Sequence, residues 1–440
     1  MGLTTPQKIR NLQRKLYLKA KAEPEFRFYM LYDKIYREDI LEHAFRLAQA
    51  NGGAAGVDSK SFSDIESGGV ERWLTGIRKE LHEKTYRPQP VLRVYIPKPG
   101  GGRRPLGIPT IKDRVVQTAC KLVIEPIFEA DLEPNAYGYR PGRSAKDAIR
   151  QVHRMLCHGY SDVVDADLSK YFDTIPHKEL MKSIARRIVD KHVLGLIKMC
   201  LKVPVVETDD DGKRCITGGK RTKRGTPQGG VVSPLLANVY MNRFLKYWRL
   251  KRCDGRYTAR VVSYADDFVI LSRGHAKASL QWTRDVMARL GLKLNEEKTG
   301  VKNARKERFD FLGYTFGPHY YRKDGHWYLG ASPSKKSVQR VKLGVRRILR
   351  PGNMGRWPVV RDRVNRVLVG WSNYFSYGTR LMAYRAVDQY VYDNVRHFLT
   401  RRQKVPSRGT RIYPQERVHG ELGVVSLRRI QLGAPPCAVR

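Results

Sequence analysis

The sequence predicts an α+β fold that ends in a basic, mostly helical unit. Two observations predict the α+β part: short valine-rich runs typical of buried strands occur between longer segments of helical spacing. A third observation sets the C-terminal unit apart. From Ala331 to Arg440 the chain has 23 Lys and Arg against 5 Asp and Glu, a local excess of 23 − 5 = +18. With 440 residues the chain is long enough for two or three packed units.

The first third of the chain indicates helices interrupted by one strand and one loop. Residues 25–50 have helical spacing, and a cluster of glycines directly after them ends the pattern. Residues 91–97, VLRVYIP, have the composition of a strand. A loop, KPGGGRRP, is expected at 98–105, and a mostly helical stretch then extends to about residue 130.

The middle of the chain contains the strands that the fold class depends on. VVDAD at 163–167 is a short apolar run typical of a buried strand, and a helix is expected from Pro176. After RGTPQGG at 224–230, the run VVSPLLANVYMNRFL predicts a helix to about residue 245. TARVVSY and DFVILS then form a predicted hairpin with a tight turn at Ala265-Asp266.

The C-terminal unit has helical spacing with interleaved aromatic residues. ASPSKKS at 331–337 has the composition of a linker between it and the preceding strands. In VLVGWSNYFSYG, the side chains of Trp371, Tyr374 and Phe375 have two interpretations. They could stack on nucleobases, as exposed aromatics of basic proteins do, or they could form the core of the unit. We favour the core.

The charge balance points to nucleic acid. The chain has 84 Lys and Arg against 42 Asp and Glu, a formal net charge of +42. A compact protein tolerates that self-repulsion best when a polyanion neutralises it. The alternative is a cationic surface that only keeps the protein soluble.

Cysteine spacing and hydropathy exclude several classes of protein. The six cysteines are scattered singly without C-x-x-C spacing, so neither a zinc site nor a disulfide framework is indicated. No apolar run approaches the roughly 18 residues of a membrane helix. The basic N-terminus lacks the apolar core of a secretory signal and predicts a charged helix that faces nucleic acid, with an organellar presequence as the alternative. We therefore expect a cytoplasmic protein.

Two adjacent carboxylates, Asp266 and Asp267, lie in the turn of the predicted hairpin. Crowding like charges is unfavourable unless something positive accompanies them, and a divalent metal such as Mg²⁺ takes carboxylate oxygens. VVDAD offers a third carboxylate from Asp165 or Asp167, which period-two alternation places on one face of the strand. Two metals held by three carboxylates suit an in-line displacement at phosphorus, and Lys98 and the nearby arginine of the glycine-rich loop could bind a triphosphate.

Seven motifs resemble those of reverse transcriptases, in the order of that family. SYADDFVI resembles the Y-x-D-D catalytic motif, DADLSKYFDTIPH the first aspartate motif, and RGTPQGGVVSPLLANVYMN the helix after a Gln-containing turn. The others are IPKPGGGRRPLGIPTIKDRVVQ, YGYRPGRSAKDA, LKLNEEKTG and FDFLGYTF. IPK…RPLGIP and GYRPGRS are typical of group II intron-encoded reverse transcriptases, and GWSNYF and HGELGV resemble their thumb, the maturase or X domain. The resemblance covers roughly residues 25–430.

The resemblance implies a right-hand polymerase with fingers, palm and thumb, the palm built on an antiparallel sheet. It divides the chain into a basic N-terminal extension with the start of the fingers at 1–80, and fingers and palm at 81–330. A helical thumb or maturase (X) domain at 331–420 and a C-terminal tail at 421–440 complete it. The tail has no His/Cys cluster of the endonuclease type, so the resemblance is to the endonuclease-lacking branch.

The resemblance also assigns the metal ligands. Asp167, Asp266 and Asp267 match the catalytic metal-binding triad, which leaves Asp165 as a neighbour. The implied cofactor is Mg²⁺, as two ions, with Mn²⁺ as an alternative. Tyr264 is expected to pack beneath the site.

The implied dNTP-binding residues are Lys98 and Arg104 for the triphosphate, Phe172 beneath the sugar, Gln228 at the nascent base pair, and Lys298 near the leaving pyrophosphate. The ring of Phe172 would clash with a 2′-hydroxyl and so select dNTPs over rNTPs. Lys298 has two interpretations of equal weight, a general acid or a solvated lysine at a turn.

Phe311, Leu312 and Gly313 match the primer grip. The predicted function is RNA-directed DNA synthesis by an enzyme that also binds structured intron RNA and assists its splicing and mobility. Its partners would be that RNA, an RNA template with a DNA primer, and dNTPs, with no membrane. The alternatives are a domesticated relative in phage defence or spacer acquisition, and an RNA-binding splicing cofactor with a vestigial polymerase site. The intact triad argues against the second.

Overall fold

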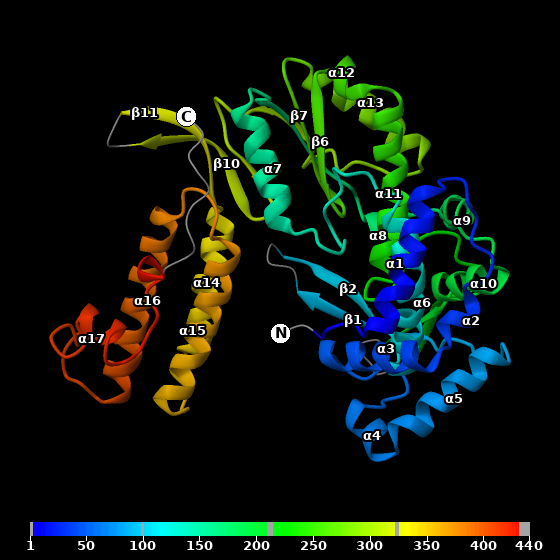
Figure 1. The fold of residues 1–440 in the computed structure, drawn as a ribbon. Helices are drawn as coiled ribbons and strands as arrows, with labels where there is room; N and C mark the ends of the chain where they lie inside the picture. Colours follow the sequence, from blue (N-terminus) through cyan, green and yellow to red (C-terminus); the bar gives the residue numbers. More distant parts are fainter. Residues whose placement is uncertain (1–2, 98–100, 209–213, 220, 322–324, 431–440) are drawn as a thin grey trace.

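The computed structural model describes residues 3–97, 101–208, 214–219, 221–321 and 325–430. Figure 1 shows N-terminal helices on one side of the molecule, a central sheet with its helices, and a separate group of C-terminal helices on the opposite side. Helices and antiparallel sheets alternate irregularly along the chain, which confirms the α+β prediction.

The N-terminal helices pack around one long, buried helix, α6 (Ile111–Glu129). Of its 19 residues 14 are buried, so α6 is enclosed nearly all round. The helices that surround it are α1 (Gln7–Ala22), α2 (Tyr32–Ile35), α3 (Glu38–Asn51), α4 (Phe62–Ser67) and α5 (Val70–His82). The basic helix predicted at the N-terminus is α1, which buries one apolar face and keeps most of its lysines and arginines exposed.

A four-stranded sheet in the order β2-β1-β4-β5 lies next to these helices. Its strands are β1 (Val91–Pro97), β2 (Arg103–Ile108), β4 (Pro204–Thr208) and β5 (Arg214–Gly218). β1 confirms the predicted strand. The loop predicted at 98–105 is too long, because Arg103 and Arg104 pair with Pro97 and Ile96 as part of β2. Antiparallel pairing with β1 therefore overrides the glycine and proline turn signals at the end of that segment.

The central sheet has the order β6-β7-β3-β8, and every pair in it is antiparallel. Its strands are β3 (Asp162–Asp167), β6 (Ala259–Tyr264), β7 (Asp267–Ser272) and β8 (Gly300–Asn303). The predicted strand at 163–167 and the predicted hairpin are both confirmed. Alternate side chains bury both faces: Val164 and Phe268 join a core with α11 (Ser233–Leu250), whereas Val163 and Val269 join a core with α7 (Ala145–Cys157).

The remaining helices of this region connect the strands. They are α8 (Tyr171–Thr174), α9 (His177–Ala185), α10 (Lys191–Leu201), α12 (Cys253–Arg256) and α13 (Ala276–Arg289). The helix expected from Pro176 is α9, and α11 runs five residues beyond the predicted end at 245. The short helix α8 was not predicted, because a single turn leaves no periodic pattern in the sequence.

Three further strands form a sheet in the order β11-β10-β9: β9 (Phe309–Phe311), β10 (Tyr314–Tyr321) and β11 (His326–Pro333). The linker predicted at 331–337 is wrong. Ala331 is buried in β11 opposite Phe316, and Ser334 caps α14 (Lys335–Ile348) by accepting a hydrogen bond from the Ser337 N–H. The serines and proline that suggest a linker are here a strand end followed by an N-cap.

The C-terminal helices have a hydrophobic core of their own, formed by α14, α15 (Trp357–Tyr374), α16 (Leu381–Arg402), α17 (Gln415–His419) and a short 3₁₀ helix at Leu427–Arg429. Phe375 is buried, and Trp371 and Tyr374 are partly buried against the same cluster. The interpretation of these three residues as core is therefore confirmed. Within the described residues no helix is both long and apolar enough to cross a bilayer, and Cys437 lies outside them.

Candidate active site

Strand register brings the candidate carboxylates together. Asp167, at the end of β3, lies directly opposite Asp267, the first residue of β7. Side chains that alternate along a strand place Asp165 on the same face as Asp167, away from the core formed with α11. Asp266 occupies the turn between β6 and β7, next to Asp267. Four carboxylates therefore gather at one end of the sheet, although three belong to the predicted triad.

The turn that carries Asp266 is held from behind by a neighbouring segment. The Tyr137 N–H donates to the Ser263 carbonyl at 2.8 Å, so the chain runs alongside β6. A Cβ added at Gly138 would lie 2.4 Å from the backbone nitrogen of Ala265. No side chain fits between these two backbones, and the Asn238 amide fixes the Gly138 carbonyl from the other side at 2.7 Å. The YGYRPGRS motif thus begins as the support of the catalytic turn.

A second turn wraps around Asp167. The Asn295 N–H donates to the Asp167 carbonyl at 2.8 Å, and the Lys298 Nζ lies 3.0 Å from the Asp167 Oδ2. This hydrogen bond and the charge of Asp167 raise the pKa of Lys298. The structure therefore places Lys298 in the site. Its exposed side chain is nonetheless paired with a carboxylate rather than free in solvent.

The carboxylates perturb one another. Desolvation in the cleft raises the pKa of Asp267 to about 7, even though solvent reaches its side chain from the open side. The next contributions are the negative charges of Asp266, Asp167 and Asp165. Burial also raises the pKa of Asp266, and the charge of Asp167 adds to it. A cation placed among these groups would relieve the repulsion.

The predicted metal triad is not assembled as a finished site. Across the described residues, no three His, Cys, Asp or Glu side chains are grouped closely enough to hold a metal ion. Asp167 is paired with Lys298, and Asp165 with the Lys302 Nζ at 3.0 Å. The two lysines therefore take the place of positive charge beside β3. The donor set still suits Mg²⁺, because it consists of carboxylate oxygens that lack sufficient compensating charge.

The predicted nucleotide-binding residues lie around the carboxylates. Arg104, on β2, is close enough that its charge lowers the raised pKa of Asp266. The Gln228 Nε2 donates to both carboxylate oxygens of Asp173 at 3.1 Å, and its carbonyl accepts from the Gly107 N–H at 2.5 Å. The turn at 224–230 is thereby tied to β2. Lys98 lies outside the described residues.

Phe172 and two residues that sequence reasoning missed form one wall of the site. The Phe172 ring lies 6.5 Å from the ring of Tyr139, which lies 6.5 Å from Tyr264 in turn. Burial and the charge of Asp266 raise the pKa of Tyr139. Tyr139 has a φ of +54°, and its place between two glycine-containing turns in YGYRPG was the available signal. Asp173, the partner of Gln228, had no signal beyond its proximity to Phe172 in the motif.

The predicted primer-grip residues form the tight turn between β9 and β10. Leu312 and Gly313 have φ of +49° and +79°, and their carbonyls accept hydrogen bonds from C-terminal residues. The Tyr374 hydroxyl donates to Leu312 at 2.9 Å, and the Ser337 hydroxyl donates to Gly313 at 2.9 Å. A cavity of about 220 Å³ joins Phe311, Leu312 and Gly313 to Asp167, Asp267 and the exposed cations of α14.

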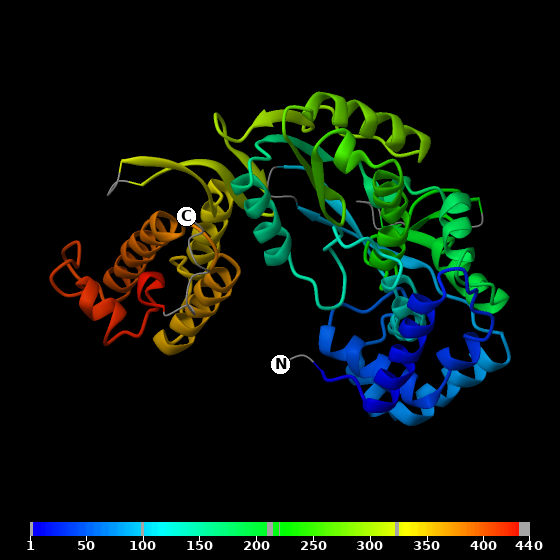
Figure 2. The same cartoon turned by 45° about the horizontal axis from the view of Figure 1, so that its top comes forward.

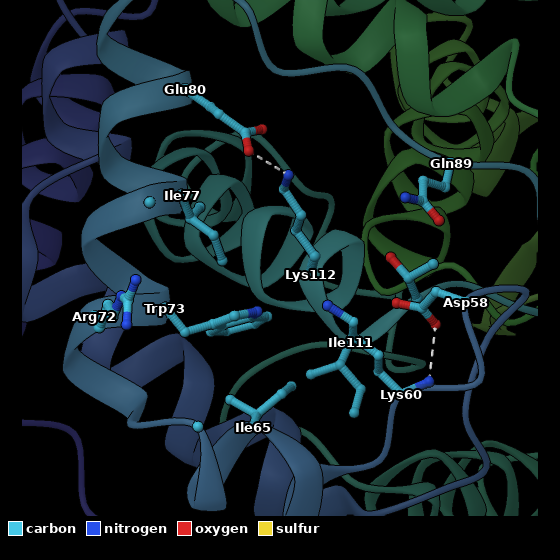
Figure 3. A pocket seen from close by; sticks show the side chains of 13 residues that line it. Asp58, Lys60, Ile65, Arg72, Trp73, Ile77, Glu80, Gln89, Ile111 and Lys112 are labelled. Carbon is cyan, nitrogen blue, oxygen red and sulfur yellow. Dashed lines mark hydrogen bonds and ion pairs between the residues drawn. The ribbon is translucent and has the colours of Figure 1, made fainter.

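A larger cavity, of about 440 Å³, lies elsewhere, between α4, α5 and the start of α6. Figure 3 shows Trp73 lying across it among Ile65, Ile77 and Ile111. Its two acidic lining residues do not form a carboxylate cluster, since Glu80 pairs with Lys112 at 2.5 Å. Size alone therefore does not identify the catalytic site, and the carboxylate geometry does.

Comparison with known protein families agrees with this geometry. Residues 96–316, about half of the chain, match the family model described as "Reverse transcriptase (RNA-dependent DNA polymerase)". The chain belongs to the reverse transcriptase family. Residues 338–413 match a second model, "Group II intron, maturase-specific domain", which covers α15, α16 and most of α14.

Several relatives share long stretches of this reverse transcriptase. It is 34% identical to Protein YkfC of Escherichia coli (strain K12) over 345 residues, which are 70% of this chain and 87% of that protein. It is 30% identical to the group II intron-encoded protein LtrA of Lactococcus lactis subsp. cremoris over 350 residues, 65% of this chain and 56% of LtrA. Nuclear intron maturase 2, mitochondrial, of Arabidopsis thaliana is 34% identical over 114 residues, 26% of this chain and 15% of that protein. The chain spans about half the length of LtrA.

These matches confirm the group II intron type of reverse transcriptase and its right-hand fold with a helical C-terminal region. They support RNA-directed DNA polymerase activity and a role in intron splicing and mobility. The α4–α6 region with the β1-β2 sheet corresponds to the fingers of such an enzyme, the β3-β6-β7 sheet to its palm, and α14–α16 to its thumb.

Gly138→Ala should impair both stability and DNA synthesis. The added methyl group would meet the Ala265 nitrogen at 2.4 Å and would displace the turn that carries Asp266. We expect a loss of about 1–3 kcal/mol in the free energy of unfolding, as for other overpacked sites, and reduced primer extension. Chemical denaturation and a primer-extension assay would measure the two effects. Gly195→Ala, in helix α10 with no atom within 4 Å of the added carbon, is the control and should retain full activity. Wild-type behaviour of Gly138→Ala would contradict the role given to this contact.

Proposed function

We propose that the carboxylate end of the palm sheet transfers a nucleotide from a dNTP to the 3′-hydroxyl of a DNA primer paired with an RNA template. The observation that supports this most directly is the register of β3 and β7, which places Asp167 opposite Asp267 with Asp266 beside them. The raised pKa of Asp267 shows that the protein alone does not compensate this charge.

The three carboxylates Asp167, Asp266 and Asp267 would hold two Mg²⁺ ions, or Mn²⁺ as an alternative. Bound there, the ions would activate the primer hydroxyl and neutralise the leaving pyrophosphate. Asp165 is excluded from this set on two grounds: its Oδ2 pairs with Lys302, and it lies two residues further from the turn of the hairpin. Its role is to add negative charge beside Asp267.

Basic residues on opposite sides of the carboxylates would bind the triphosphate. Arg104, on β2, reaches the site from the fingers, and Lys98 would do so from the preceding loop. Lys298 approaches from the turn around Asp167, where its raised pKa keeps it protonated. A protonated amine at that position can stabilise the pyrophosphate and donate a proton to it.

Phe172 and Gln228 would select the incoming nucleotide. Phe172 sits on the short helix α8 with its ring against Tyr139, so it cannot turn away from a bound sugar without losing that contact. Its bulk would exclude a 2′-hydroxyl. Gln228 is oriented by Asp173 and by the backbone of β2, which fixes the floor of the nascent base pair.

The thumb and the N-terminal helices would bind the intron RNA. The thumb and tail segment carries the +18 excess noted above, and α1 exposes most of its lysines and arginines. Phosphate contacts from these surfaces would hold a structured RNA largely independently of sequence. The splicing chemistry would be that of the RNA, with the protein stabilising its fold.

Asp266→Ala should abolish extension of a DNA primer on an RNA template with Mg²⁺ and dNTPs. We expect a loss of about a thousandfold or more, because metal ions supply several kcal/mol of transition-state stabilisation. Asp165→Asn is the matched control, a nearby carboxylate outside the triad, and should retain most of the activity. Equal extension by wild type and Asp266→Ala, measured with labelled primer on denaturing gels, would rule out the assignment. A loss confined to Asp165→Asn would show that the wrong carboxylate of β3 was chosen.

Phe172→Ala should weaken the discrimination between dNTPs and rNTPs. Removing the ring opens space for a 2′-hydroxyl, and contacts of this size change selectivity about 10- to 100-fold. Single-nucleotide incorporation of dATP and ATP would give the ratio of kcat/KM values for each variant. Phe172→Tyr keeps the ring and should keep the preference for dATP. An unchanged ratio in Phe172→Ala would assign sugar selection to another residue.

In metal-free buffer, Asp267→Asn should raise the Tm at pH 8 by more than at pH 5. Folded Asp267 keeps its proton up to about pH 7, whereas an unfolded aspartate releases it near pH 4. Its contribution to stability is therefore present at low pH and is lost as the pH rises from about 4 to about 7. At pH 8 the variant removes a repelled charge that the wild type retains. Asp285→Asn, an exposed aspartate on α13, is the control. A larger effect at pH 5 would contradict this.

A further inference from the structure

The hairpin of β10 and β11 extends beyond the part of it that is packed into the protein. Figures 1 and 2 both show it projecting from the palm on the side of the thumb. Near the palm, Tyr314, Phe316 and Ala331 are completely buried. Toward the tip, Tyr320 is 51% exposed and Trp327 is 67% exposed. Two large aromatic side chains therefore lie in solvent at the end of an otherwise well-packed element, and we call this pair the aromatic arm.

The two rings of the aromatic arm belong to one face of the hairpin. Tyr320 pairs with Trp327 across the strands, and this pair continues the face on which Phe316 pairs with Ala331. The ring centroids lie 5.2 Å apart with an angle of 50° between the planes, so the rings do not stack flat on each other. Each ring can therefore still offer a face to a third aromatic group.

The base of the aromatic arm is fixed to the thumb. Tyr328, on the opposite face of β11, hydrogen bonds through its hydroxyl to the Thr379 hydroxyl at 2.8 Å. His153 of α7 hydrogen bonds to the Leu329 carbonyl at 3.0 Å. The arm is thus held in one orientation relative to palm and thumb, and a ligand on it would not have to order it first.

The surrounding sequence favours a polyanion over a protein partner. Between Leu312 and Arg361 the chain has 11 Lys and Arg and a single acidic residue, Asp324. Exposed aromatics beside cations suit unpaired nucleotides, because bases stack on the rings while phosphates contact the basic groups. An apolar protein partner would have to desolvate this positive charge without neutralising it.

The position of the arm separates it from the catalytic cleft. Seven strand residues connect Gly313 of the primer grip to Tyr320, which at about 3.3 Å per residue corresponds to about 23 Å. A nucleotide on the arm is therefore well beyond the base pair being formed.

We propose that Tyr320 and Trp327 form a stacking site for unpaired RNA nucleotides outside the polymerase cleft. The inference rests on the proposed binding of RNA by this chain and adds a defined contact to it. Stacking and phosphate contacts differ in their salt dependence, since only the latter release counterions. The arm should therefore add affinity that salt does not remove.

The test is a salt titration of RNA affinity. Fluorescence anisotropy with a labelled single-stranded oligoribonucleotide would give the Kd of the full chain between about 50 and 200 mM salt. We expect the double variant Tyr320→Ala/Trp327→Ala to bind about tenfold more weakly at every salt concentration, with an unchanged slope of log Kd against log salt. Tyr320→Phe/Trp327→Phe keeps the rings and should bind like wild type. Met354→Ala, an apolar side chain that is 82% exposed in the thumb, should also bind like wild type.

Several results would overturn the proposal. Wild-type affinity of the double alanine variant would show that the pair only stabilises the hairpin, and a changed salt slope would show ionic contacts instead. A change in sedimentation with no change in RNA affinity would make the arm an interface between two copies. If wild type itself fails to bind RNA, the proposed function fails together with the arm. The circular dichroism spectrum and Tm of each variant would establish that loss of affinity is not loss of fold.

Discussion

The structure depends on one unfavourable arrangement, the crowding of carboxylates at the open end of an antiparallel strand pair. Asp167 faces Asp267 because the register of β3 and β7 allows no other pairing without moving a buried strand. Lys298 and Lys302 compensate part of this charge from neighbouring strands and turns. The part that remains raises the pKa of Asp267 and prepares the site for cations. Catalysis in this enzyme therefore begins with repulsion that the fold maintains.

The packing behind the site is what maintains it. Both faces of the palm sheet are covered, one by α11 and the other by α7, so neither strand can slip to separate the charges. Gly138 holds the catalytic turn from its outer side, where backbone touches backbone. A site that must tolerate its own repulsion needs this rigidity, because a flexible turn would simply swing Asp266 into solvent. The requirement explains why a glycine, rather than a larger residue, stands at that contact.

Sequence reasoning found the elements whose pattern is local. The hairpin at 259–272, the strand with Asp167 and the long helices all have periodicity that a single sequence displays. It failed where distant segments decide the structure. Arg104 lies in a strand because β1 is available to pair with it, and residues 331–337 complete a strand because Phe316 lies opposite. Tyr139 and Asp173 were missed for the same reason, since each acts through a residue far away in the chain.

The primer-grip turn joins the two halves of the enzyme through shared hydrogen bonds. Gly313 accepts bonds from the Ser334 N–H and the Ser337 hydroxyl at the start of the thumb, and Leu312 accepts one from Tyr374 in α15. A movement of α14 would therefore shift the turn that faces Asp267 across a cavity of about 220 Å³. RNA bound along the thumb can thus bias the position of the primer end without touching the carboxylates. In this arrangement, binding of a structured RNA and DNA synthesis are coupled by geometry rather than by a shared residue.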